Sequence, residues 1–406
     1  MKIVMCTDAY WPRVNGVTVS VDSFARALIR NGHQVVIICS FYPDTMAIER
    51  MSNPLMDRRE TEADPIVIRV PSYSLPISRE DRVAKFHKWF WVEKQLSAFN
   101  PDLIHVNSEF VIGEFGYYYA RMHDLPVVYT FHTMWEDYAA NYIPYVPEFI
   151  LRMIARSIVK RLCRKATTVI CPTSQIADLV RRYKTQAPVH LLPTGIDPRL
   201  FTPQPDGLEE FRQSMIARFP ALTRSKILLF AGRIGKEKNI SFLLELFPTI
   251  LHAAPDTTLL LVGNGPDLPH FLDQANELGI TDHVVFTGYL DRKDLAYVYA
   301  MSTVFVFPSR TETQGLVTIE AMLSGIPVVA VGEMGTVTVM GGDNGGFMVK
   351  NDPAEFAGRV IELLLDDELY AQKVEDARIH AQSWTIDSMT ARLEDIYTTT
   401  LEDFNA

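Results

Sequence analysis

Residues 303–330, TVFVFPSRTETQGLVTIEAMLSGIPVVA, decide the fold class of this chain of 406 residues. The apolar run at 304–307 predicts a buried strand, and the apolar side chains between 316 and 323 recur at the spacing of a helix. A glycine and a proline are typical of the helix end, and a second apolar run at 326–331 predicts the next strand. A strand, a helix and a following strand indicate an α/β fold with a parallel sheet.

Two carboxylates lie between the first strand of this stretch and the early turns of its helix. Glu312 belongs to the polar loop, and Glu320 belongs to the helix. Ligands of open α/β sheets bind at the carboxyl ends of the strands, so both glutamates are candidate binding residues. The alternative is a pair of solvated carboxylates, one of them favourable beside the helix N-terminus.

Length and composition favour two domains in a chain without a membrane span. A single core stops growing at roughly 250–300 residues, and 48% of the residues are apolar. Residues 196–225 show few packed elements and predict a linker between domains at 1–195 and 226–384, with a last helix at 385–406. No run approaches the roughly 18 apolar residues of a spanning helix. Because the chain also opens on a strand pattern and its four cysteines show no framework, we expect a cytoplasmic protein.

The charge is distributed unevenly along the chain. The net charge of −10 disfavours a general nucleic-acid-binding protein. Residues 1–200 contain 24 Lys and Arg against 20 Asp and Glu, whereas residues 201–406 contain 15 against 29. The sequence therefore predicts that only the amino-terminal half faces an anionic partner.

A glycine and a histidine follow predicted strands of the first half. The strand at 3–7 is followed by Gly16 and a helix at 19–30. Gly16 either lets backbone amides approach a phosphate or merely serves the turn. The pattern G-x-G-x-x-G is absent there, which disfavours a dinucleotide cofactor. His132 follows the strand at 126–131 and is either a ligand-binding residue or a structural histidine.

Two predicted helices of the first half are rich in basic residues. The first, at 82–99, also contains several aromatic residues. The second, at 148–165, is amphipathic, with Leu151, Ile154, Ile158 and Leu162 on its apolar side. Its basic stripe recurs at every fourth position and consists of Arg152, Arg156, Lys160 and Arg164. Such a stripe is either a solvated face or a surface that attracts anionic lipid headgroups.

Basic residues also follow the first strand of the second half. The strand at 226–231 leads into GRIGKEKN at 232–239, before a helix. A diphosphate needs fixed cations, and arginine binds its oxygens through two nitrogens while lysine acts as a point charge. Arg233 and Lys238 are therefore candidate anion-binding residues, and ordinary loop charges are the alternative.

These motifs, in this order, resemble a known family. PSRTETQGL with its following glutamate and GIPVV, GRIGKEKN, the VGNGP loop at 262–266, PDLIH at 101–105 and the FHT…E…Y pattern at 131–138 are similar to retaining glycosyltransferases of the family-4 type. Among these, the pattern is most similar to diacylglycerol glucosyltransferases. The resemblance implies the GT-B fold, in which two Rossmann-like domains face each other across a cleft and the last helix returns to the first domain.

The resemblance also implies roles for individual residues. Arg233 and Lys238 would bind the donor diphosphate, Glu320 would accept hydrogen bonds from the ribose, and Glu312 and His132 would hold the sugar at the catalytic centre. The acceptor side would include Trp135, Tyr138 and the basic stripe. The complete set of expected donor-binding residues is Gly16, Arg233, Lys238, Gly263, Tyr289, Gln314, Gly315, Leu316 and Glu320.

The expected activity is that of a retaining hexosyltransferase that needs no metal and binds no nucleic acid. It would move glucose from UDP-glucose to a lipid such as 1,2-diacylglycerol, at the anionic inner face of the cell membrane. A soluble transferase for a sugar or small metabolite, a phosphatidylinositol-type mannosyltransferase and a non-catalytic sugar-nucleotide-binding protein are the alternatives. The motifs leave the donor base, the sugar, the acceptor and the oligomeric state open.

Overall fold

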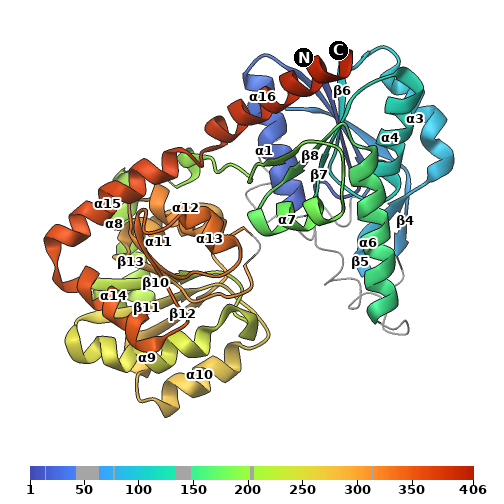
Figure 1. Cartoon of the computed structure of the whole chain (residues 1–406). Coiled ribbons are helices and arrows are strands. Elements are labelled where there is room, and N and C mark those ends of the chain that lie inside the picture. The colour runs from blue at the N-terminus through green and yellow to red at the C-terminus, as the bar shows by residue number, and fades with distance from the viewer. Residues whose placement is uncertain (14, 43–63, 76–77, 133–147, 202–204, 313) are drawn as a thin grey trace. The chain divides into compact units, whose positions relative to one another are not determined.

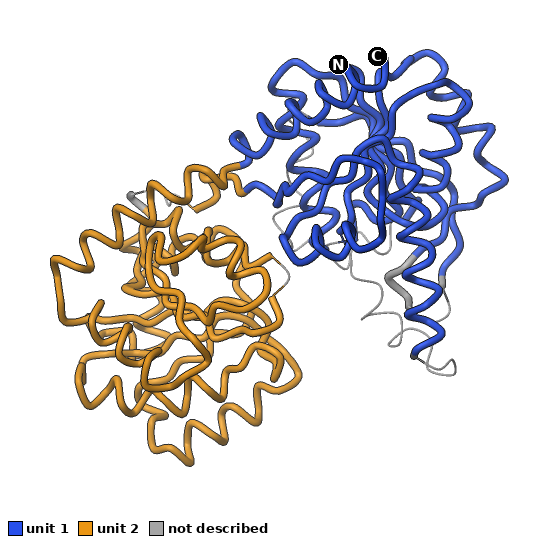
Figure 2. Tube along the Cα trace, viewed as in Figure 1, with its two compact units in different colours: residues 1–195, 386–406 blue, residues 196–385 orange. Residues whose placement is uncertain are grey.

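The protein is described by a computed structural model that covers residues 1–13, 15–42, 64–75, 78–132, 148–201, 205–312 and 314–406 (Figure 1). Two compact units divide it (Figure 2). The first consists of Met1–Gly195 together with Ile386–Ala406, and the second of Ile196–Thr385. Each unit has its own parallel sheet, so the predicted α/β class with two parallel sheets is confirmed.

The first unit is built on a seven-stranded sheet in the order β3-β2-β1-β6-β7-β8-β9. Every strand pair in it is parallel. Strand order reverses between β1 and β6, which makes this the topological switch point where ligands of such sheets bind. The strands are β1 Lys2–Thr7, β2 Gln34–Ser40, β3 Ile66–Val70, β6 Leu103–Val106, β7 Val127–Thr130, β8 Thr168–Cys171 and β9 Val189–Leu191.

Helices and a small hairpin complete the first unit. Helix α4 contacts both α3 and α6. Its Phe115 packs against Trp89 of α3, and its Glu114 pairs with Arg161 of α6. The helices are α1 Gly16–Arg30, α3 Trp89–Leu96, α4 Val111–His123, α6 Glu148–Lys165, α7 Ser174–Arg182 and α16 Ile386–Asn405. The hairpin joins β4 Ser72–Leu75 to β5 Ser78–Ala84.

The expected single helix at 82–99 was wrong in its first part. Strand β5 continues to Ala84, which pairs with Ser72 of β4, and a 3-10 turn at Phe86–Lys88 precedes α3. Lys85 is extended, with φ −75° and ψ 104°, so the helix cannot start there. Cross-strand pairing therefore overrides the local helical pattern.

The second unit is built on a six-stranded sheet in the order β12-β11-β10-β13-β14-β15. The quoted stretch forms its centre as predicted, with β13 Val304–Phe307, α12 Leu316–Leu323 and β14 Val328–Val331. The other strands are β10 Lys226–Ala231, β11 Thr257–Val262, β12 Val284–Gly288 and β15 Gly346–Val349. Besides α12, the helices are α8 Pro205–Arg218, α9 Ile240–Ala253, α10 Leu268–Glu277, α11 Arg292–Met301, α13 Gly335–Met340, α14 Pro353–Leu365 and α15 Asp367–Gln382. The 3-10 turns are η2 Pro198–Leu200, η3 Pro220–Thr223, η4 Lys236–Lys238 and η5 Thr281–His283.

The stretch 196–225 does not have the few packed elements predicted for a linker. It includes α8, η2 and η3, and it belongs to the second unit. Met215 and Leu222 are buried, so the stretch contributes to the core of that unit. The prolines of this stretch suggested a linker, but two of them begin helical segments, at positions where proline is tolerated. The sequence pattern therefore did not reveal the packing.

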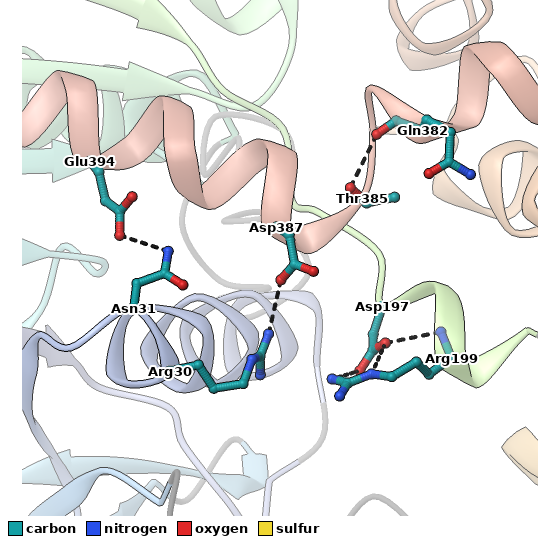
Figure 3. A network of polar contacts seen from close by, with 8 residues as sticks. All are labelled: Arg30, Asn31, Asp197, Arg199, Gln382, Thr385, Asp387 and Glu394. Atoms are coloured by element: carbon teal, nitrogen blue, oxygen red, sulfur yellow. Dashed lines mark hydrogen bonds and ion pairs between the residues drawn. The ribbon is translucent and has the colours of Figure 1, made fainter.

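The last helix, α16, packs on α1 within the first unit. Arg30 pairs with Asp387 at 3.1 Å, and the Asn31 side chain donates to Glu394 at 2.9 Å (Figure 3). In the second unit, the backbone N–H of Ile196 donates to the Trp384 carbonyl at 3.0 Å. The chain thus leaves the first unit at Gly195 and re-enters it at Ile386.

Candidate active site

The second unit gathers charged residues at the carboxyl end of its sheet. Strands β10 and β13 are neighbours, although they are separated by two strands in sequence, so the switch point lies between them. The loop after β10 carries Arg233 and Lys238, and the loop after β13 carries Glu312. The fold therefore brings together residues that are about 75 positions apart in the sequence.

Lys238 and Glu312 form an ion pair in which Nζ lies 2.6 Å from Oε2. The two side chains are only 18% and 24% exposed. Asn239, in the left-handed conformation at φ +59°, donates through Nδ2 to the Pro308 carbonyl at 3.2 Å and ties the two loops together. The Glu312 carbonyl also accepts from the backbone N–H of Gly335 at 2.9 Å. The predicted diphosphate-binding lysine and the predicted sugar-binding glutamate are thus direct partners.

Arg233 has a different environment from Lys238. Its side chain is 66% exposed, and its Nε lies 4.0 Å from Glu237. This contact spans exposed groups and contributes little to stability. The guanidinium therefore remains accessible to an anionic ligand at the end of β10.

Gly263 lets the ends of neighbouring strands approach one another closely. Gly263 has φ +137°, and a Cβ placed on it would lie 1.8 Å from the Gly232 carbonyl oxygen. Its N–H donates to the Gly288 carbonyl at 3.0 Å, which joins the end of β11 to the end of β12. Tyr289 follows directly and is 70% exposed. The ends of β10, β11 and β12 are thus held together by backbone contacts, and an exposed tyrosine follows the last of them.

The N-terminus of α12 also lies at this edge. Gly315 is its N-cap, with φ +69°, and a Cβ there would meet Thr336 backbone atoms at 3.3 Å. Gln314 is half-buried, and Leu316 begins the helix. The first N–H groups of a helix lack partners within it and favour an anion. These three residues are therefore placed where backbone donors are available.

Glu320 is held by two side chains of α11. Its Oε2 accepts from the Tyr299 hydroxyl at 3.1 Å, and its Oε1 lies 3.7 Å from the Arg292 guanidinium. Burial raises the pKa of Glu320, while Arg292 and the hydrogen bond from Tyr299 oppose that rise. The side chain keeps 14% of its surface exposed, so a ligand hydroxyl can still reach it. Sequence reasoning missed Arg292 and Tyr299, because no local spacing relates α11 to α12.

In the first unit, His132 lies just beyond β7, at the carboxyl edge of the sheet. Its Nε2 is 2.9 Å from Oδ1 of Asn107, which follows β6. Burial lowers the pKa of His132 to about 4. Next to it, His105 contacts Tyr397 of α16 at 2.6 Å and Thr130 at 2.7 Å. Sequence reasoning missed Asn107, although its position after a predicted strand was a usable signal.

A cavity of about 10 Å³ lies beside these histidines. That volume is about the space needed for one water molecule. Its lining combines polar and apolar side chains, namely Ser20, Phe24, His105, Asn107, Thr130, His132, Ile170, Pro172, Leu192, Thr194 and Leu393. The cavity is therefore part of the polar cluster around His132 rather than a separate substrate pocket.

Of the remaining predicted residues, Gly16 is described, whereas Trp135 and Tyr138 lie outside the described residues. Gly16 is the first residue of α1, and Asn15 caps this helix by accepting from the Thr18 N–H. A Cβ on Gly16 would meet no heavy atom of the described residues within 4 Å. Packing therefore does not require glycine there, and its role toward a ligand stays a prediction.

The basic stripe of α6 faces outward for most of its length. Arg152, Arg156 and Arg164 are exposed and Lys160 is half-buried. Ile154, expected on the apolar side, is instead 48% exposed, because the buried line follows Leu151, Ala155, Val159 and Leu162. Phe149 and Met153 are 71% and 63% exposed and lie in the same half of the helix. The outward face of α6 is therefore both basic and apolar near its N-terminus.

Two further searches concern the described part of the chain only. Among its residues, no group of three or more His, Cys, Asp and Glu side chains is placed to hold a metal ion. Within the same ranges, every helix is too short or too polar to cross a membrane.

Two doubly wound parallel units, one of them with acidic and basic groups at its switch point, define a two-domain α/β enzyme of the GT-B type. Residues 14–200 match the family model described as Glycosyltransferase Family 4, and residues 212–380 match Glycosyl transferases group 1. The chain belongs to this family of glycosyltransferases, which confirms the resemblance inferred from its motifs.

Individual relatives agree with this assignment. The chain is 32% identical over 338 residues to an alpha-monoglucosyldiacylglycerol synthase of Streptococcus pneumoniae, covering 82% of this chain and 71% of that protein. It is 25% identical over 407 residues to an alpha-monoglucosyldiacylglycerol synthase of Acholeplasma laidlawii, covering 98% and 96%. The structure of Anabaena HepE in complex with UDP has a TM-score of 0.74 at 17% identity, over 98% of this chain and 100% of that one, and shows the shared fold. The protein is therefore an enzyme, a hexosyltransferase, as the sequence predicted.

Proposed function

We propose that the enzyme transfers glucose from UDP-glucose to 1,2-diacylglycerol at a membrane surface, with retention at the anomeric carbon. The observation that carries the donor part is the Lys238–Glu312 pair beside the accessible Arg233, at the switch point of the second unit. The two diacylglycerol-glucosylating synthases, which match 82% and 98% of the chain, support the acceptor, and the UDP held by HepE supports the nucleotide.

In this proposal, electrostatics drive departure of the diphosphate. Arg233 and Lys238 stabilise the negative charge that develops on the leaving group, and the N–H groups at the start of α12 add fixed donors. Glu312 orients the sugar through its hydroxyls, and Glu320 accepts from the ribose hydroxyls. The acceptor hydroxyl bonds to the anomeric carbon on the face from which the diphosphate departs. Its proton passes to an oxygen of the leaving phosphate, and the anomeric configuration is retained.

The acceptor part of the proposal depends on the outward face of α6. The first unit contains 24 basic and 24 acidic residues, because α16 returns five carboxylates to it. The folded first unit therefore has no net formal charge, unlike residues 1–200 taken alone. Attraction to an anionic membrane must then come from a local basic surface such as that of α6. Each basic residue near an anionic surface contributes about 1 kcal/mol. Burial of Phe149, Met153 and Ile154 would add an apolar component that salt does not weaken.

A product assay tests the whole proposal. Purified enzyme receives a panel of UDP- and GDP-sugars with either vesicles that contain diacylglycerol or soluble sugar acceptors, and mass spectrometry identifies the products. Formation of glucosyl-diacylglycerol from UDP-glucose supports the proposal. A mannosylated inositol lipid or a glycosylated soluble metabolite as the product would replace it with one of the alternatives.

A charge reversal tests the membrane part by itself. We expect Arg152→Glu, Arg156→Glu and Lys160→Glu together to abolish binding to anionic vesicles at low salt, while UDP binding survives. A control with the same change in charge reverses three basic residues of the second unit, namely Arg212, Arg218 and Lys350. Equal flotation of both triple variants with vesicles would show that α6 is not the docking surface.

A further inference from the structure

Two contacts, one with the His105 carbonyl and one with the His132 ring, fix the orientation of the Asn107 side-chain amide. Its Nδ2 donates to the His105 carbonyl at 3.3 Å, and its Oδ1 lies 2.9 Å from Nε2 of His132. An amide turned the other way would place two donors against His132 and an oxygen against a carbonyl oxygen. The two contacts together therefore assign the oxygen of Asn107 to His132.

This orientation determines which nitrogen of His132 carries the proton. An amide oxygen can only accept, so Nε2 must be the donor in the contact with Asn107. In a neutral imidazole, the second nitrogen then has a lone pair and no hydrogen. Because burial lowers the pKa of His132 to about 4, the neutral ring is the form present near neutral pH. Nδ1 is consequently an acceptor.

We propose that Asn107 is a positioning residue that presents Nδ1 of His132 as a hydrogen-bond acceptor to a hydroxyl group of the substrate. The proposal rests on the proposed function, since it assumes that His132 meets a sugar or glycerol hydroxyl. A lone pair repels a phosphate oxygen, which has no hydrogen to donate. His132 thus takes part in recognition of a hydroxyl and not of the diphosphate.

Among the residues that the structure describes, no carboxylate contributes to the lowered pKa of His132, whose cause is burial. His105, on β6, is an ionisable group whose charge is coupled to that of His132, and its own pKa is lowered to about 3, chiefly by burial. Tyr397 on α16 and Thr130 on β7 complete the contacts of His105 through their hydroxyls. An aspartate in place of Asn107 would therefore be a new negative charge in direct contact with the imidazole.

Asn107→Asp tests the proposal through the pH dependence of transfer. A carboxylate beside Nε2 favours the imidazolium ion, which turns Nδ1 from an acceptor into a donor. In the wild type, we expect the transfer rate to change less than about twofold between about pH 6 and about pH 8.5, because His132 stays neutral throughout. A neighbouring opposite charge raises such a pKa by up to about three units, so in Asn107→Asp we expect the rate at the lower pH to fall several-fold, and at most about tenfold, relative to that at the higher pH.

Two comparisons make the result decisive. Asn276→Asp changes the same residue type on exposed α10 and should keep the wild-type pH profile. A loss of activity in Asn107→Asp that is equal at every pH would indicate a merely structural asparagine and overturn the inference.

A spectroscopic readout separates this inference from the proposed function. The ¹⁵N signals of histidine-labelled wild-type protein, assigned with a His132→Gln variant, report which nitrogen is protonated. We expect the Nε2–H form, and an Nδ1–H form would overturn the inference whatever the activity. If the wild type transfers none of the offered sugars, the proposed function fails, while the tautomer is still measured.

Discussion

Replacing Glu312 by glutamine separates two proposed roles of this carboxylate, which are to compensate the charge of Lys238 and to hold the donor sugar. In the unliganded protein, Glu312 compensates the charge of Lys238 at 2.6 Å. Glu312→Gln keeps the size of the side chain but removes its charge, so the lysine becomes fully available to a diphosphate. We expect free UDP to bind more tightly to this variant, while sugar transfer falls because the sugar loses its charged partner.

The magnitude follows from the geometry of the pair. A diphosphate held by Lys238 would lie on its far side from Glu312, at roughly 8 Å, where two unit charges interact by about 2 kcal/mol at an effective dielectric constant of about 20. The side chains are 18% and 24% exposed, and solvent screening reduces this value. Taking about half, or about 1 kcal/mol, predicts roughly fivefold tighter binding of UDP.

Isothermal titration calorimetry measures the effect directly on folded protein. Glu333→Gln is the matched control, because Glu333 also follows a strand and pairs with a basic residue, Arg310, at 3.0 Å. It should leave the dissociation constant of UDP within about twofold of the wild-type value. If Glu312→Gln binds UDP as weakly as the wild type or more weakly, the assignment of Lys238 to the diphosphate is wrong.

Three further outcomes follow from the second unit. Arg233→Ala should lower transfer at least about tenfold without a change in Tm, because its exposed guanidinium contributes little to stability; unchanged kinetics would contradict its role. Glu320→Gln should weaken UDP binding about tenfold or more. In Arg292→Gln, the affinity for UDP should be lower at pH 6 than at pH 8, because loss of Arg292 raises the pKa of Glu320 further and favours its protonated form. Gly263→Ala should unfold at least about 4 °C lower in thermal melts, because its Cβ would overlap the Gly232 carbonyl, and an unaltered melt would exclude that close approach.

The positions of most elements follow from local patterns, and the failures have a common cause. The strand at 226–231 and the helix at 148–165 match their predicted bounds, because apolar periodicity and end signals agree there. The helix predicted from residue 82 and the linker predicted at 196–225 failed where contacts with another element decide the structure. Residues 82–84 pair with β4, and α8 packs on α11.

The candidate site could be predicted where a short motif marks it. Glu312, Glu320, Arg233 and Lys238 were proposed from loop position, charge and family resemblance, and their roles stay predictions. Their supporting residues were not, because a hydrogen bond between side chains on different elements has no spacing in the sequence. Arg292 is the clearest example. In the sequence it is an ordinary basic residue at the start of a helix, and only the packing of α11 beside α12 brings it to Glu320.

The sequence by itself determined the class of fold, the order of the elements and the family, since apolar periodicity and short motifs are properties of neighbouring residues. Only the tertiary structure decided that Lys238 pairs with Glu312, that Asn107 lies within hydrogen-bond distance of His132, and that the carboxylates of α16 belong to the first unit and balance its basic residues. These depend on strand order and helix packing, which join residues far apart in the chain. The free energy of an ion pair or a hydrogen bond falls steeply with distance, so such properties exist only after folding.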